Sequence, residues 1–394
     1  MKLRRSQHEA RVRRLLRDNP VVAVLGARQV GKTTLARDVV ATWRGPKSFF
    51  DLEDPVDRRK LADPGLLLRA ASGLVVLDEV QLLPEVFSLL RVLADRPGTP
   101  ARFLVLGSAS PELLQQSSET LAGRIAHYEL AALHCGELQR SRGYSLERLW
   151  LRGGFPRSYL ARNDAASAQW RTDFVGTFLH RDIPAFRPGL PAAQLERFWQ
   201  MLAHGHGQIW NAAEIARSLG TTDPVARRYL DLLAQTYVVT VLAPWHENLA
   251  KRQVKSPKVY LTDSGLLHSL LGVQALDDLL GHPKVGSSWE GFLLQQVVQR
   301  LGARRDECYF WATHQGAELD LLVVRGGRRI GVEFKRTDAP EVTKSMNIAM
   351  ADLGLDELIV LHGGKESWPM AERIRAVAAT QLLREVSPLA SARP

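Results

Sequence analysis

The segment Gly26–Thr33 reads Gly-Ala-Arg-Gln-Val-Gly-Lys-Thr, which is the spacing of a phosphate-binding loop. An apolar run, Val21–Leu25, precedes it, and a helical stretch begins at Lys32. Glycines let backbone N–H groups curl around an anion at a helix N-terminus. The pattern predicts that Lys32 reaches the β- and γ-phosphates of ATP and that the Thr33 hydroxyl ligates Mg²⁺. The expected nucleotide contacts are Gly26, Ala27, Arg28, Gln29, Val30, Gly31, Lys32, Thr33 and Thr34.

Two further strand ends carry polar residues that suit the same site. The apolar run Leu74–Leu77 ends in Asp78 and Glu79, so we expect Asp78 to hold Mg²⁺ and Glu79 to act as general base. A strand that simply ends in a charged turn is the alternative, and the phosphate loop upstream argues against it. Another strand, Phe103–Leu106, ends near Ser108, which we expect beside the γ-phosphate; a solvated strand end is the alternative.

A second concentration of charge lies in the C-terminal third. Two apolar runs flank Gly326-Gly327, which is a strong hairpin signal. A turn centred between these glycines puts Asp320 opposite Glu333 and Glu318 opposite Lys335, with all four side chains on one face. Three acids and a lysine on one face are costly unless they are solvated or bind a metal ion.

The middle of the chain carries a pair of short helix signals. Residues Asn211–Gly220 and the segment that starts at Pro224 are joined by a short polar turn, which is the shape of a helix-turn-helix. Two strand-like runs follow, on either side of a basic loop. If DNA binds here, we expect phosphate contacts from Arg227, Arg228, Lys251, Arg252, Lys255 and Lys258. A purely protein-binding role for this region is the alternative.

The order of the elements predicts a multidomain α/β chain. Between residues 21 and 135, buried apolar strands alternate with helices, which indicates a parallel sheet with helices on both faces. We expect an ATPase core at 1–135, a helical connector at 136–191, a winged helix at 192–262, an α/β domain at 263–388 and a disordered tail at 389–394.

In this order of motifs, residues 21–130 resemble an AAA+ ATPase. The stretches FFDLEDP, VLDEVQLLP, LGSAS, LAGRIAHYEL, GGFPRSYL and HRDIP resemble a prokaryotic AAA+ group whose C-terminal domain was long classed as of unknown function. That resemblance implies a homo-oligomer, with a hexamer as one candidate, in which a neighbouring subunit donates an arginine to the ATP site. Arg124 is our first candidate for this arginine and Arg157 the second; a surface ion pair is the alternative for either.

The hairpin segment resembles the PD-(D/E)XK nucleases, which implies a restriction-endonuclease-like α/β domain. The resemblance implies that Asp320 and Glu333 hold Mg²⁺ or Mn²⁺, with Glu290 from a preceding helix, and that Lys335 orients or activates water. The chain departs from the motif at Leu319, where the motif has proline. DNA cleavage, DNA binding without cleavage and a protein-binding remnant all stay open.

The composition indicates the cellular compartment and the kinds of partner that we expect for this chain. No apolar run is long enough to cross a bilayer, so we expect no membrane partner. Two cysteines, Cys135 and Cys308, cannot form a disulfide framework, which is typical of the reducing cytoplasm. The net charge of +10 favours a polyanionic partner, with nucleic acid as the first candidate.

We therefore expect a cytoplasmic ATPase that remodels, translocates along or processes branched or broken DNA. An ATP-dependent metal nuclease in repair or defence is one alternative. A nucleotide-controlled switch that binds protein and performs no DNA chemistry is the other.

Overall fold

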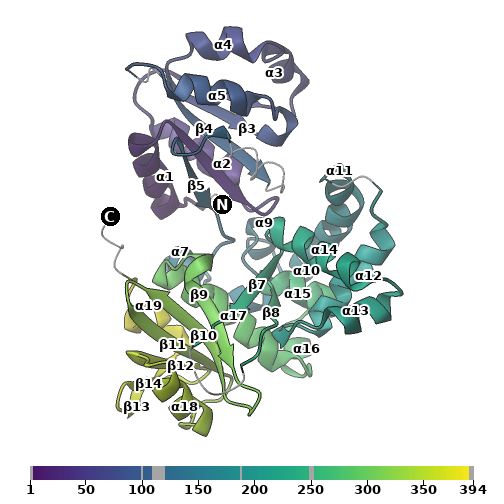
Figure 1. Cartoon of the computed structure of the whole chain (residues 1–394), viewed down its shortest axis with the longest axis vertical. Helices are drawn as coiled ribbons and strands as arrows, with labels where there is room; N and C mark the ends of the chain where they lie inside the picture. The colour runs from purple at the N-terminus through teal and green to yellow at the C-terminus, as the bar shows by residue number, and fades with distance from the viewer. Residues whose placement is uncertain (1–2, 99–100, 109–119, 187–188, 248–252, 390–394) are drawn as a thin grey trace. The chain divides into compact units, whose positions relative to one another are not determined.

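The computed structural model describes residues 3–98, 101–108, 120–186, 189–247 and 253–389. The chain divides into two compact units, which are described separately (Figure 1). The N-terminal unit comprises Met1–Ala132 with Gln235–Tyr237, and the C-terminal unit comprises Leu133–Ala234 and Val238–Pro394. Of the tail expected at 389–394, only Leu389 is among the described residues.

The N-terminal unit is built on a parallel five-stranded sheet in the order β2-β3-β4-β1-β5. This confirms the sheet type and all five strands predicted from the sequence. Its strands are β1 (Val21–Gly26), β2 (Lys47–Asp51), β3 (Gly73–Asp78), β4 (Ala101–Ser108) and β5 (Ile125–Glu129). Its described helices are α1 (Ser6–Asp18), α2 (Lys32–Thr42), α3 (Pro55–Lys60), α4 (Pro64–Ala70), the 3₁₀ turn η1 (Val80–Leu82) and α5 (Val86–Ala94).

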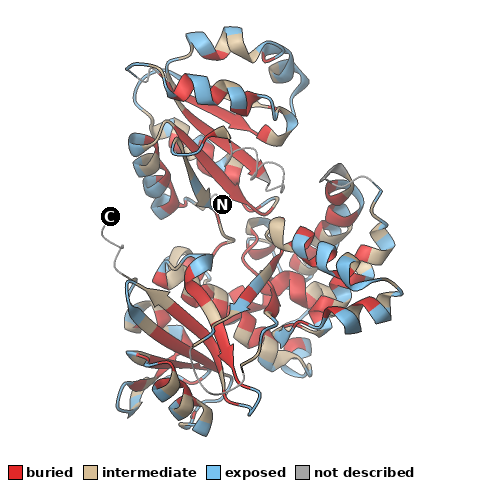
Figure 2. Ribbon diagram, viewed as in Figure 1, coloured by how far each residue is buried: buried red, intermediate tan, exposed pale blue. Residues whose placement is uncertain are grey.

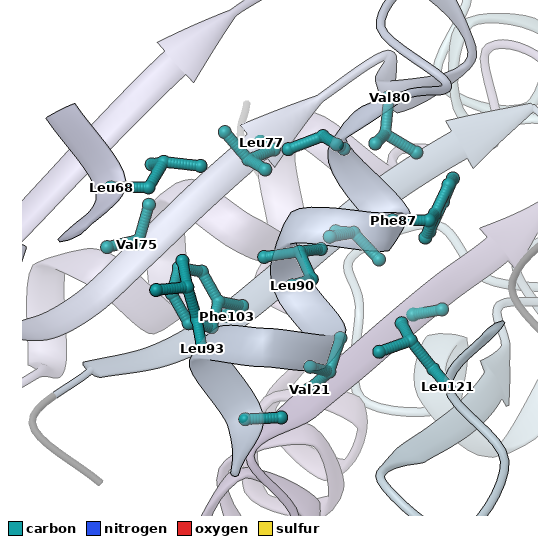
Figure 3. Packing of buried hydrophobic residues seen from close by; sticks show 14 of the residues in the cluster. Val21, Leu68, Val75, Leu77, Val80, Phe87, Leu90, Leu93, Phe103 and Leu121 are labelled. Carbon is teal, nitrogen blue, oxygen red and sulfur yellow. The ribbon is translucent and has the colours of Figure 1, made fainter. Parts of the chain in front are cut away.

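Helices cover both faces of this sheet. Side chains alternate along each strand, so Val21, Val75 and Phe103 share one face and pack with Leu68 of α4 and Leu90 of α5 (Figure 3). Helices α1 and α2 pack against the sheet through β1 and β4. Burial on both faces explains why the strands read as continuous apolar runs.

The C-terminal unit contains a larger set of helices. They are α7 (Cys135–Leu138), α8 (Leu146–Arg152), α9 (Pro156–Tyr159), α10 (Asp164–Thr177), the π-helical turn η2 (Phe178–Asp182), α11 (Ile183–Phe186), α12 (Ala192–His204), α13 (Ala212–Leu219), α14 (Asp223–Gln235), α15 (Ser264–Leu270), α16 (Leu276–Leu280), α17 (Val285–Leu301), η3 (Arg305–Glu307), α18 (Lys344–Asp352), η4 (Ala379–Gln381) and α19 (Leu382–Glu385). The expected helical connector corresponds to the first of these, from α7 to α11.

A single mixed sheet of nine strands runs through this unit, in the order β13-β14-β12-β11-β10-β9-β7-β8-β6. The strands are β6 (Gln208–Ile209), β7 (Val239–Pro244), β8 (Lys258–Leu261), β9 (Cys308–Ala312), β10 (Glu318–Arg325), β11 (Arg328–Lys335), β12 (Glu357–His362), β13 (Trp368–Ala371) and β14 (Ile374–Ala378). Because β7 pairs with β9, the sheet crosses the boundary that we expected at residue 262. The two expected C-terminal domains therefore share one sheet.

Two short helices joined by a turn form where the sequence predicts them. Helix α13 ends at Gly220, whose φ of 63° is the left-handed conformation that favours glycine at this position. Helix α14 follows after a short turn, and β7 and β8 then pair in antiparallel fashion. The assignment of this region as a DNA-binding winged helix stays a prediction.

Buried residues gather along the strands of both sheets and on the inner sides of the helices (Figure 2). Within the described residues, every helix is too short or too polar to cross a membrane.

Candidate functional site

The phosphate loop connects β1 to α2 through backbone conformations that favour glycine. Gly26 has φ 155° and Gly31 has φ 104°. A Cβ on Gly26 would lie 2.5 Å from the carbonyl oxygen of Leu130, so no larger residue fits there without a shift of the backbone. Because the loop follows β1 and precedes α2, it lies at the carboxyl edge of the sheet and at the N-terminus of a helix. The first backbone N–H groups of a helix have no partners within the helix and can bind an anion.

Lys32 lies inside this loop. Its side chain is buried, and its Nζ donates to the carbonyl oxygens of Gly26 and Ala27 at 3.0 Å each. Burial lowers the pKa of Lys32 to about 8, against the raising effect of Glu79 and Asp78. An anionic phosphate would favour the protonated form, so the loop is arranged to take up a negatively charged ligand.

Asp78 and Thr33 come together across the carboxyl edge of the sheet, as predicted. Asp78 is buried, and burial raises its pKa to about 6, while its hydrogen bond with the Thr33 side chain acts in the opposite direction. A hydroxyl and a carboxylate that lie side by side suit Mg²⁺, which prefers oxygen ligands.

Glu79 follows in a left-handed conformation with φ 55°, which is uncommon for a residue other than glycine. Its backbone N–H donates to Asp78 Oδ1 at 3.1 Å, and Gln81 donates from its side-chain amide to the Glu79 carboxylate. The sequence analysis did not single out Gln81. Its position, two residues after Glu79, could have indicated a contact with the Glu79 carboxylate.

The strand that ends at Ser108 lies between β1 and β3, as expected. The register pairs Ser108 with Gly26, so the backbone of Ser108 stands at the first residue of the phosphate loop. The side chain of Ser108 is outside the described part of the chain.

Two arginines, Arg124 and Arg5, form side-chain contacts at different places in the N-terminal unit. Arg124 precedes β5, and its backbone carbonyl accepts from Val21 at the amino edge of the sheet, away from its own phosphate loop. Its guanidinium pairs with Asp95 at 2.6 Å. Arg5, which the sequence analysis did not select, donates to the carbonyl oxygen of Val30 in the loop at 3.3 Å and to that of Ala131 at 2.9 Å.

The C-terminal hairpin has the predicted register. β10 and β11 are antiparallel, and their residue pairs from Leu321↔Val332 to Arg325↔Arg328 follow the spacing set by Gly326 and Gly327. Both glycines have positive φ, as a two-residue turn between strands requires. A β-bulge interrupts the pairing of β10 with β9 between Leu319 and Leu322. Bulges re-aim side chains, and this one contains Asp320.

The predicted acidic residues gather around a lysine that we had assigned elsewhere. Lys258 Nζ lies 3.5 Å from Glu290 Oε1 and 3.7 Å from Asp320 Oδ1, and it forms an ion pair with Glu318. Only 5% of the Lys258 side chain is exposed. The expectation that Lys258 contacts DNA phosphates from a surface loop is therefore wrong: the residue begins the buried strand β8, and its charge is held by carboxylates.

Tyr260, two residues further along β8, was also missed. Its hydroxyl donates to Glu290 Oε1 at 2.6 Å. The sequence Lys-Val-Tyr-Leu could have predicted this contact, because it places a lysine and a tyrosine at alternate positions of an otherwise apolar strand. A charge that is buried in such a strand needs a partner.

Glu333 and Lys335 form the second part of the acidic site. Lys335 Nζ lies 2.7 Å from Glu333 Oε2, and the negative charge of Asp320 acts on both residues. Burial raises the pKa of Glu333 to about 8, and burial with the nearby Asp320 raises that of Glu290 to about 7. Asp320 itself accepts from the backbone N–H of Phe334 at 3.0 Å.

The carboxylates of this cluster are chemically suited to bind a divalent cation. Carboxylate oxygens from α17, β10 and β11 are the ligands that Mg²⁺ and Mn²⁺ prefer. In the described residues, however, no three carboxylates of this cluster bring oxygens within 4.8 Å of one another. The ammonium of Lys258 stands between them.

Apart from Lys258, the predicted DNA-contact residues that the structure describes are exposed. Arg227 and Arg228 are exposed on α14, and Lys255 is exposed before β8, whereas Lys251 and Arg252 lie outside the described residues. Arg227 borders an open depression together with Trp210, Asn211 and Ser256.

Comparison with known families divides the chain into three parts. A family described as an AAA domain matches residues 18–139, which include the phosphate loop and Asp78. Two domains of unknown function, DUF8612 and DUF4143, match residues 143–277 and 285–382. The N-terminal unit is thus an AAA-type P-loop ATPase domain.

Two uncharacterized mycobacterial proteins resemble nearly the whole chain. They are Rv2008c of Mycobacterium tuberculosis and Mb2031c of Mycobacterium bovis, each 47% identical over 383 residues, which is 97% of this chain and 85% of the relative. This chain belongs to their family.

Solved structures resemble the chain more distantly. The Walker-type ATPase PABY2304 of Pyrococcus abyssi is 15% identical, with a TM-score of 0.47 over 68% of this chain and 96% of that one. The RuvB Holliday junction branch migration motor of Thermotoga maritima is 16% identical, with a TM-score of 0.31 over 69% and 96%. Both scores lie below 0.5, so neither similarity assigns a function to this chain.

Proposed function

We propose that this AAA-type protein hydrolyses ATP and acts on DNA, remodelling or processing branched or broken duplexes as a homo-oligomer. The observation that supports ATP turnover is the convergence of Lys32, Thr33, Asp78 and Glu79 at the carboxyl edge of one sheet. Mg²⁺, when bound with ATP, would neutralise charge on the phosphates.

The chain's own residues would divide the work of hydrolysis. Lys32 exchanges its two carbonyl partners for phosphate oxygens, and the loop backbone holds the β-phosphate. Thr33 and Asp78 hold the metal ion. Glu79 accepts a proton from the attacking water, and Arg124 reaches the site of the next subunit after it leaves Asp95.

Charge supports DNA as the partner. The chain carries a net charge of +10, and the second helix of the helix-turn-helix exposes Arg227 and Arg228. Side chains of this kind contact phosphates and position a protein on the duplex without reading its sequence.

The test is the ATPase rate of the purified chain with and without linear, forked and four-way DNA. We expect DNA to raise the rate, and Lys32→Ala to abolish both the basal and the stimulated activity. An ATPase that neither binds DNA nor responds to it at low salt would refute the DNA part of the proposal in favour of a protein-binding switch.

A metal-dependent nuclease is the second candidate function, and the acidic cluster of Glu290, Asp320 and Glu333 favours it. Lys335 Nζ is held 2.7 Å from Glu333 Oε2, where it would orient or activate the attacking water. We expect Mg²⁺- or Mn²⁺-dependent cutting that is lost in Asp320→Asn and Lys335→Met and retained in Lys365→Met, which changes an exposed lysine. Intact linear, forked and four-way substrates with both metals would exclude cleavage.

A further inference from the structure

Lys258 stands where carboxylates of two different elements converge. Its Nζ is within 4.0 Å of oxygens from Glu290 of α17 and from Glu318 and Asp320 of β10. The ammonium also lies 5.6 Å from the centre of the Phe310 ring, which is fully buried. A buried positive charge is thus surrounded by three carboxylates and one aromatic ring.

The strand β8 is built to keep this charge in place. Lys258 and Tyr260 alternate on β8, and both reach Glu290. Burial alone would lower the pKa of Lys258, but Glu290, Asp320 and Glu318 outweigh burial and raise it above its ordinary value. The lysine is thus a permanent cation that partly neutralises the cluster.

We propose that Lys258 occupies the position of the divalent cation, so that its ammonium and the metal compete for Glu290 and Asp320, the two metal-site carboxylates that lie beside it. This inference rests on the divalent site in the proposed function. It accounts for the separation of the carboxylates, which cannot close around a metal ion while the ammonium lies between them. Lys258 therefore sets the metal affinity of the site, and loading requires its side chain to withdraw.

A purely structural ion pair makes a different prediction. Loss of a structural lysine leaves the carboxylates uncompensated and lowers stability without improving metal binding. Competition predicts that the same loss tightens metal binding even if stability falls. The direction of the affinity change separates these two roles.

The experiment titrates the full chain with Mn²⁺ alone, without nucleotide, and measures bound metal by electron paramagnetic resonance. All proteins carry Asp78→Asn, which removes the other expected metal ligand. We expect Lys258→Met to bind Mn²⁺ at least about tenfold more tightly than the parent, because a like charge has left the site. Lys258→Arg, which keeps the charge, and Lys255→Met, which changes the exposed lysine three residues earlier, should match the parent.

Two failures are distinguishable. Equal affinity in Lys258→Met and the parent, with binding lost in Asp320→Asn, would overturn competition and leave the metal site standing. No Mn²⁺ bound by any variant, Lys258→Met included, would remove the metal site itself.

A measurement on the unsubstituted lysine covers the case in which Lys258→Met does not fold. Acetylation of surface amines, read by mass spectrometry, should leave Lys258 unmodified without metal. Saturating Mn²⁺ should make Lys258 reactive, since its side chain withdraws, while Lys255 reacts equally in both conditions. A Lys258 that stays unreactive with Mn²⁺ bound would contradict the inference.

Discussion

At the scale of residues, both candidate sites depend on charges that burial makes costly. Lys32 and Asp78 are buried in the ATPase domain, and their pKa values shift in the directions that desolvation dictates. Lys258 is buried in the C-terminal unit, and its carboxylate partners keep it charged. Such residues are retained for ligand binding more readily than for stability, because a buried ion pair is a weak source of stability.

Glu79 gives the first prediction. Glu79→Gln should bind ATP with nearly unchanged affinity but hydrolyse it at least about 100-fold more slowly, because the amide cannot accept a proton from water. Single-turnover hydrolysis and equilibrium binding of a fluorescent ATP analogue measure the two effects. Glu85→Gln, at an exposed position nearby, is the matched control. Normal turnover in Glu79→Gln would remove Glu79 from this role.

At the scale of elements, strands and turns could be predicted from the sequence, whereas the contacts between side chains of distant elements could not. The strands of the N-terminal sheet and the β10–β11 hairpin were predictable, because apolar runs and Gly326-Gly327 encode them locally. The position of Lys258 was not, because its carboxylate partners Glu290 and Asp320 belong to α17 and β10, which lie much later in the chain. Strands β13 and β14 were missed because they are short, and Pro369 and Arg375 interrupt their apolar patterns.

Three helices of the C-terminal unit meet at a buried histidine, His268. Its Nδ1 lies 2.9 Å from the carbonyl oxygen of Leu151 in α8, and its Nε2 lies 2.7 Å from the Ser288 hydroxyl in α17. A carbonyl only accepts, so Nδ1 donates and Nε2 accepts from Ser288, whose oxygen accepts from Trp150. The network is complete only with a neutral ring.

This network predicts acid sensitivity. Burial lowers the pKa of His268 to about 3, below its unfolded value near 6.5, so the unfolded chain binds more protons between these values. Stability from His268 is therefore complete above pH 6.5 and is lost as the pH falls toward 3. Between pH 7 and 5.5 the loss should be about 1 kcal/mol.

Urea unfolding of the parent and of His268→Gln at the two pH values measures this loss. His268→Gln should be less stable throughout but lose less stability on acidification, while His204→Gln, at an exposed position, should behave as the parent. An identical pH response in His268→Gln and the parent would contradict the assignment.

At the scale of the whole molecule, the chain has an AAA-type ATPase unit and a second unit, in which one sheet includes the strands that follow α13 and α14 and the strands that carry the acidic cluster. The shared sheet gives a physical reason for Lys258, from the strand beside the helix-turn-helix, to enter the acidic cluster. Assembly into oligomers was inferred from the resemblance to AAA+ ATPases and stays a prediction. The backbone of Arg124 lies at the opposite edge of the sheet from the phosphate loop of the same chain.

Arg124 tests that assembly. Arg124→Ala should still bind ATP but hydrolyse it at least about 100-fold more slowly, because transition-state charge loses its partner. Mixing Arg124→Ala with Lys32→Ala subunits should restore part of the activity, since one subunit supplies the arginine and the other the intact loop. Asp95→Asn, which only frees Arg124, should keep the parent rate. No recovery on mixing, with an equal loss in Asp95→Asn, would make Arg124 a structural residue.

The most direct test of the account is calorimetric titration of the purified chain with Mg-ATP. We expect binding to the parent, with affinity reduced at least about 100-fold in Lys32→Ala and a clear dependence on Mg²⁺ that Asp78→Asn removes. Equal affinity in the parent and Lys32→Ala, or no binding to either, would contradict the claim that the loop after β1 holds the triphosphate.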